Sequence, residues 1–131
     1  MFNDDPLKID RRPGKSADTL IYSLTGPLLL RNMFDLQAEL RKGPTPPLTI
    51  LDLTAVPYMD SAGIGLVVNH HVHCQNKGLR LVVVGVAPRV MEVFKIIKVD
   101  AILKMTDTVE AAEAEQPVVK VESSENTSLR G

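Results

Sequence analysis

The residues best suited to chemistry stand together in the run Asp60-Ser61-Ala62-Gly63. Before this run, residues 48–53 have the apolar, β-branched composition of a buried strand, and an apolar helix begins at about Ile64. A strand that turns into a helix here directs backbone N–H groups and the positive end of the helix dipole toward the Ser61 hydroxyl. Any group that Ser61 carries would therefore face these N–H groups. The alternative is that Ser61 only caps the helix.

A hydrolytic role for Ser61 lacks the other residues that it needs. The nucleophile elbow G-x-S-x-G is absent, and the three histidines follow on the same helix rather than on a later loop. We therefore expect no enzymatic activity and no cofactor. Gly63 and Gly65 make room either for a bound partner or nucleotide, or for close packing of the helix on the sheet. No G-x-G-x-x-G or Walker motif is present.

The helix after Ser61 also carries a cluster of histidines and a cysteine. His70 and Cys74 are four residues apart, which is the spacing of a metal-binding pair on one helical face. The apolar stripe of the helix, however, passes through His71 and Cys74, so we expect these two to be buried and His70 and His73 to point outward. Without a carboxylate or a second cysteine nearby, a core cysteine and solvated imidazoles are favoured over a metal site.

The rest of the chain places this turn in an alternating α/β domain. Residues 7–10 and 19–25 predict two strands, antiparallel because the link between them is short. The further predicted elements are a helix over 29–41, the strand over 48–53, a helix from about 64 to 76, a strand over 79–84, a helix that begins at Pro88, a strand over 101–105 and a final helix capped by Thr106 or Asp107. The order β-β-α-β-α-β-α-β-α predicts an α/β fold with a mixed sheet of four to five strands and helices packed mainly on one face.

The length and composition predict a single domain in a reducing compartment. The chain has 131 residues, a formal net charge of -1 and one cysteine, which exclude a disulfide framework and give no reason to expect nucleic acid as a partner. No apolar run reaches a transmembrane length, and the N-terminus lacks the pattern of a signal peptide, so we expect no membrane association and a cytoplasmic location. Polar composition predicts a flexible N-terminus over 1–6 and a flexible tail over 116–131, which leaves a domain over 7–115.

The element order and one extended motif resemble the STAS domain of bacterial anti-sigma factor antagonists. The motif is D-L-x-x-V-x-x-M-D-S-x-G-x-G over residues 52–65, and the resemblance covers about residues 7–115. It implies that Ser61 is phosphorylated by a serine kinase that is also the anti-sigma factor. It further implies that the unphosphorylated chain binds this partner and thereby frees a sigma factor, and that phosphorylation releases the partner.

The resemblance also implies a surface that binds the partner. This surface is expected to comprise Asp60, Ser61, Ala62 and Gly63 of the motif, the neighbouring Gly26, Pro27, Leu28 and Leu29, and Arg89 at a helix start. A phosphatase and a weak homodimer are further partners that the resemblance allows. Members that bind kinases commonly carry acids where this chain has Pro27 and Leu29, and a second hydroxyl residue where it has Ala62.

These departures leave a second hypothesis open. Either the partner surface is more apolar than in those members, or the chain is a scaffold or accessory subunit of a transporter or sensory complex without phosphoregulation.

Overall fold

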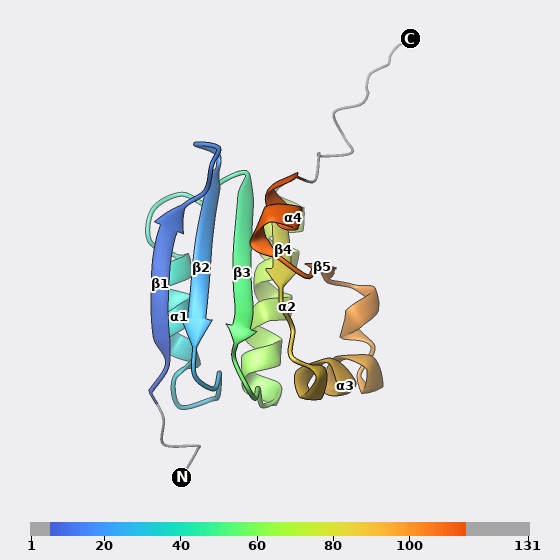
Figure 1. The fold of residues 1–131 in the computed structure, drawn as a ribbon. Helices are drawn as coiled ribbons and strands as arrows, with labels where there is room; N and C mark the ends of the chain where they lie inside the picture. The colour runs from blue at the N-terminus through green and yellow to red at the C-terminus, as the bar shows by residue number, and fades with distance from the viewer. Residues whose placement is uncertain (1–5, 115–131) are drawn as a thin grey trace.

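The computed structural model describes residues 6–114, which form one five-stranded sheet with helices on both faces (Figure 1). The strands are β1 (Lys8–Pro13), β2 (Thr19–Thr25), β3 (Leu48–Ala55), β4 (Arg80–Val84) and β5 (Lys104–Thr106), and the helices are α1 (Met33–Leu40), α2 (Ser61–Asn76), α3 (Pro88–Ile96), the 3₁₀ helix η2 (Val99–Ala101) and α4 (Val109–Ala114). The predicted tail over 116–131 and residues 1–5 of the predicted N-terminal segment lie outside the described residues.

The sheet is mixed, as predicted. The strands lie in sequence order across it, with β1 antiparallel to β2 and each later pair parallel. The short link from β1 to β2 permits only antiparallel pairing, whereas the helical crossovers return the chain for parallel pairing. The carboxyl ends of β2 and β3 therefore meet at the same edge of the sheet.

The two faces of the sheet are covered unequally. The first three helices pack on one face, where alternate residues of the strands join the larger core, and α4 lies on the other face (Figure 1). In β3, for example, Leu51 and Leu53 face the larger core, and Leu48 and Ile50 face the smaller core under α4. Burial of β3 and β4 on both sides explains their nearly continuous apolar sequence. The prediction that helices pack mainly on one face is confirmed.

The boundaries of several elements differ from the prediction. Strand β1 continues to Pro13 rather than ending at residue 10, and helix α2 begins at Ser61 rather than at about residue 64. Helix α1 begins at Met33 rather than at residue 29, because the preceding residues form an extended bridge and a turn. Strand β5 begins at Lys104 rather than at residue 101. Lys98 adopts a left-handed conformation with φ of 65°, and the carbonyl of Val99 accepts hydrogen bonds from the N–H groups of Ile102 and Leu103. These local hydrogen bonds hold the segment in a helical turn, so it cannot enter the sheet.

The predicted cap of the last helix was also wrong. Thr108 caps α4, because its Oγ1 accepts a hydrogen bond of 3.0 Å from the N–H of Ala111. Thr106 lies in β5, and its hydroxyl donates to the carbonyl of Thr108. No helix within residues 6–114 is long and apolar enough to cross a membrane.

Candidate functional site

The candidate site is built where the segments that follow β2 and β3 run side by side. Leu28 and Met59 form an isolated parallel bridge, in which the Leu28 N–H donates to the carbonyl of Tyr58 at 3.1 Å and the Asp60 N–H donates to the carbonyl of Leu28 at 3.3 Å. This bridge extends the pairing of the two strands beyond their ends. It brings the segment Gly26–Leu29 beside the Asp60–Gly63 motif.

Asp60 joins the two segments through its side chain. One carboxylate oxygen, Oδ1, accepts a hydrogen bond of 2.9 Å from the N–H of Gly63 and so caps α2, and the other, Oδ2, accepts one of 3.0 Å from the N–H of Leu30. A capping side chain of this kind contributes about 0.5–2 kcal/mol to stability. Asp60 therefore fixes both the helix start and the position of Leu30.

Gly63 permits the close approach of the two segments. A Cβ atom at this position would collide with the backbone carbonyl oxygen of Leu28, whereas a Cβ at Gly65 would meet no atom within 4 Å. Of the two roles considered for these glycines, close packing therefore accounts for Gly63. No contact within the described residues accounts for Gly65.

Asn32 holds the turn between the bridge and α1, a role that the sequence analysis missed. Its buried amide accepts a hydrogen bond of 2.9 Å from the N–H of Leu29 and donates one of 2.9 Å to the carbonyl of Pro27. Two backbone groups that lie outside regular structure are satisfied in this way. The only signal in the sequence was an asparagine shortly after Gly26-Pro27, where a turn is expected.

Ser61 is the first residue of α2 and is exposed. The alternative that Ser61 caps the helix is wrong, because Asp60 has that role. The Ser61 hydroxyl makes no hydrogen bond to any residue in the part of the chain that the structure describes. At the first two helical positions the N–H groups of Ser61 and Ala62 have no intrahelical acceptor, so they remain available to an anion on the hydroxyl.

The residues around Ser61 divide into buried supports and exposed apolar side chains. Pro27, Leu28 and Leu29 are buried, so in the free chain they position the loop and present no side chain to a partner. Leu30, whose N–H donates to Asp60, is 60% exposed, and Tyr58, which precedes the motif, is 42% exposed. Phe34, in the first turn of α1, is also 60% exposed. The predicted helix over 29–41 contains both Leu30 and Phe34. In the structure Leu30 precedes α1 and Phe34 lies in its first turn, and both side chains face solvent.

Arg89 is not brought to this site by any interaction in the structure. It is exposed at the second residue of α3 and forms no ion pair with a residue of the described range. Its expected place on the surface that binds the partner stays a prediction. Ala62 is partly exposed and Gly63 is buried, so of the motif mainly Ser61 and Ala62 present surface.

The histidine cluster of α2 is arranged differently from the prediction. His71 and Cys74 are buried, as expected, and burial raises the pKa of the Cys74 thiol. His73 is exposed, but His70 is buried rather than turned to solvent, because it lies under the C-terminal end of α1. Residues 6–114 contain no group of three His, Cys, Asp or Glu side chains that could hold a metal ion.

Comparison with known proteins agrees with this architecture. The model of the STAS domain family matches residues 11–112. Similar solved structures include an anti-sigma factor antagonist from Mycobacterium paratuberculosis, with a TM-score of 0.71 and 17% identity over 86% of this chain and 96% of that one. The phosphorylated form of the Bacillus cell fate determinant SpoIIAA has a TM-score of 0.64 and 17% identity over 81% and 97%. A sulfate transporter family protein from Wolinella succinogenes has a TM-score of 0.65 and 23% identity over 74% and 83%.

Proposed function

The chain belongs to the STAS domain family, and from this premise we propose that it is an anti-sigma factor antagonist controlled at Ser61. In this proposal the unphosphorylated chain binds an anti-sigma factor that is also a serine kinase, and a sigma factor is thereby released to direct transcription. Phosphorylation of Ser61 then dissociates the complex, and a phosphatase restores the binding form. The chain acts as a cytoplasmic binding switch and not as an enzyme.

The proposal rests on the different roles of Asp60 and Ser61 at the start of α2. Asp60 caps α2, so the Ser61 hydroxyl is left exposed and without a hydrogen bond to any described residue at the first position of a 16-residue helix. A serine that stabilises a helix start usually stands at the N-cap position. Asp60 stands there instead, so Ser61 is not needed for this purpose. A hydroxyl in this position is accessible to a kinase, and its modification breaks no hydrogen bond within the described domain.

The electrostatics of the helix start favour phosphate in the free chain. A phosphoserine carries about -1.5 to -2 charges near neutral pH. The unpaired N–H groups and the helix dipole stabilise a negative charge at this place by about 0.3–1 kcal/mol. The nearby carboxylate of Asp60 opposes the phosphate, but hydrogen bonds from Gly63 and Leu30 hold it and partly neutralise it.

In the complex the same phosphate is unfavourable. The proposed contact surface consists of Ser61 and Ala62 with the exposed side chains of Leu30, Phe34 and Tyr58. A partner that covers these apolar groups removes water from Ser61, and a buried, uncompensated charge costs several kcal/mol. The phosphate therefore weakens association while the fold of the free chain is kept.

The buried residues of Gly26–Leu29 act as supports of this surface. Their hydrogen bonds to Tyr58 and Asp60 fix the loop that presents Leu30. Because this chain has buried Pro27 and Leu29 where related kinase substrates carry acids, the surface beside Ser61 lacks those acids, and we expect the partner to place apolar groups against Leu30 rather than basic ones.

The test begins with incubation of the full chain with anti-sigma kinases from the same genome, followed by mass spectrometry. We expect one phosphate, located on Ser61, and none on Ser61→Ala. A pull-down then compares Ser61→Asp with Ser16→Asp, which places the same charge in the turn between β1 and β2, at the opposite end of the sheet. Release of the partner by Ser61→Asp alone supports the switch. Phosphate at another residue, or none with any kinase, contradicts it.

A second candidate function is a STAS scaffold or accessory subunit without phosphoregulation. The apolar character of Leu30, Phe34 and Tyr58 favours a permanent interface as well as a switched one. A transporter-family protein is among the structures of similar fold. In this case purification of the tagged full chain recovers a membrane transporter, and Ser61→Asp leaves that complex intact.

A further inference from the structure

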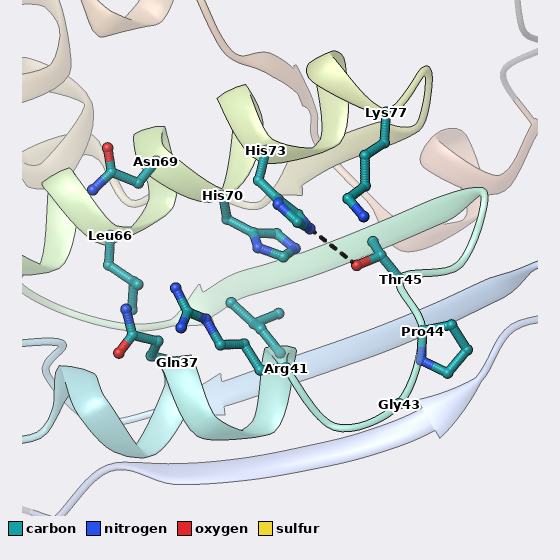
Figure 2. Close-up of a pocket in the computed structure, with 11 residues that line it drawn as sticks. Gln37, Arg41, Gly43, Pro44, Thr45, Leu66, Asn69, His70, His73 and Lys77 are labelled. Carbon is teal, nitrogen blue, oxygen red and sulfur yellow. Dashed lines mark hydrogen bonds between the residues drawn. The ribbon is translucent and has the colours of Figure 1, made fainter.

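A cavity of about 400 Å³ lies between the C-terminal ends of α1 and α2, away from the Ser61 end of both helices (Figure 2). Residues 43–45, in the connection from α1 to β3, close its third side, where the Thr45 hydroxyl lies 3.3 Å from Nε2 of His73. The volume is in the range of sites that take small molecules. The connection and both helices thus supply a formed hollow with polar groups along its wall.

The charges that line the cavity are all of one sign. Arg41 from the end of α1 and Lys77 from the end of α2 contribute cations, and no Asp or Glu lines the cavity. Cations at helix C-termini are also favoured by the helix dipole alone, so these two charges by themselves do not identify a ligand. A ligand is indicated only if the cavity also contains a polar group that lacks a partner.

His70 has such a group in its ring nitrogen Nε2. The residue is only 9% exposed, and its ring nitrogen Nε2 is buried without a hydrogen-bond partner among the described residues. Figure 2 shows its ring directed into the cavity beside His73 and Arg41. A buried polar nitrogen without a partner costs about 1–3 kcal/mol. A bound hydrogen-bond acceptor would remove this cost. The helix dipole explains the two cations but does not explain the unpaired nitrogen of His70.

A metal ion fits these residues less well than an anion. His70 and His73 stack with ring centroids 5.5 Å apart, and the lining contains no cysteine or carboxylate to complete a coordination shell. Two adjacent cations would also repel a metal ion. Burial, with His73 and Arg41 nearby, lowers the pKa of His70 to about 4, so at neutral pH its Nε2–H tautomer can donate a hydrogen bond without carrying a charge.

We propose that this cavity binds a small anion that carries a phosphate or carboxylate group. Arg41 and Lys77 hold the charge of the anion, and Nε2 of His70 donates a hydrogen bond to one of its oxygens. Arginine forms paired hydrogen bonds with either group, so the two chemistries share this recognition. The site is separate from Ser61, and its occupancy does not depend on the phosphoswitch.

The test is a titration of the full chain with sodium phosphate and, separately, with sodium succinate, against sodium chloride at equal ionic strength. The imidazole nitrogens are followed by long-range ¹H–¹⁵N NMR. We expect saturable shifts of His70 and His73 with phosphate or succinate, and a smaller response at His71, which is buried and does not line the cavity. The salt that gives saturation distinguishes a phosphate ligand from a carboxylate ligand. Shifts that are the same with chloride, or that never saturate, overturn the proposal.

Matched variants separate a specific site from general attraction of anions. Arg41→Gln removes an exposed side chain that lines the cavity, and Lys95→Gln removes an equal charge from the last turn of α3, outside it. We expect Arg41→Gln to weaken the anion affinity about tenfold or more, since hydrogen bonds to charged groups are lost. Lys95→Gln should leave it unchanged. Equal weakening by the two variants contradicts the proposed site. None of these measurements involves Ser61 or a protein partner, so their failure leaves the proposed switch untouched.

Discussion

Replacement of Gly63 by alanine tests the packing on which the site rests. The added Cβ would collide with the backbone carbonyl oxygen of Leu28, which cannot move aside without breaking the bridge between Leu28 and Met59. Overpacking of this kind costs about 1–3 kcal/mol. Alanine also gains about 0.5–1 kcal/mol over glycine in a helix interior, which opposes that cost. Gly65→Ala should gain the same helix stability without a collision, because its Cβ would meet no atom within 4 Å.

The two variants together isolate the cost of the collision. In equilibrium urea unfolding we expect Gly65→Ala to be more stable than the unchanged chain by about 0.5–1 kcal/mol. Gly63→Ala should be less stable than Gly65→Ala by about 1–3 kcal/mol. Both variants carry the same substitution in the same helix, so the unfolded states are matched. Equal stability of the two variants would refute the account of how the motif packs against Leu28.

Three further predictions follow from hydrogen bonds and burial. Asp60→Ala removes the cap of α2 and the bond to Leu30, and should lower the free energy of unfolding by about 1–3 kcal/mol in urea; a loss below about 0.5 kcal/mol contradicts both roles. Thr108→Ala should cost about 0.5–2 kcal/mol in the same assay and Asp107→Ala little, and the reverse order would restore the cap predicted from sequence. The pKa of His70 is lowered to about 4 from 6.5, so the unfolded chain takes up the proton first and stability falls by up to about 3 kcal/mol as the pH drops from 6.5 to 4. His70→Gln should flatten that decline, and an unchanged decline excludes His70 as its cause.

Much of the fold followed from the sequence because local pattern and tertiary structure agree in most of its elements. The apolar runs of β3 and β4, the Pro at the start of α3 and the turn between β1 and β2 each act through short-range preferences. The start of α1 was misplaced because apolar spacing continues through Leu30, although Asn32 and the bridge at Leu28 hold the chain out of a helix there. The bridge from Leu28 to Met59 joins segments that are distant in sequence, and Asn32 acts through local hydrogen bonds to Leu29 and Pro27. The spacing of apolar residues reports neither kind of contact.

The sequence predicted which segments lie together at the candidate site, but not which residue caps α2 or that His70 is buried. Proximity of Gly26–Leu29 to the motif follows from parallel pairing of the strands, which places their carboxyl ends together. Which of Asp60 and Ser61 caps the helix depends on a difference of one residue in the helix start, and sequence patterns do not determine boundaries so finely. His70 is buried because the end of α1 lies over α2. The apolar stripe of α2 alone does not predict this contact between two helices.

In the proposed switch, phosphate on Ser61 is tolerated by the free chain and excluded from its complex. The most direct measurement is the affinity of the anti-sigma kinase for the full chain, with and without a single phosphate on Ser61, by calorimetry at physiological salt. We expect the phosphate to weaken binding by about 100-fold or more, since like-charge contact and desolvation at an interface cost several kcal/mol. Equal affinity of the two forms would contradict the claim.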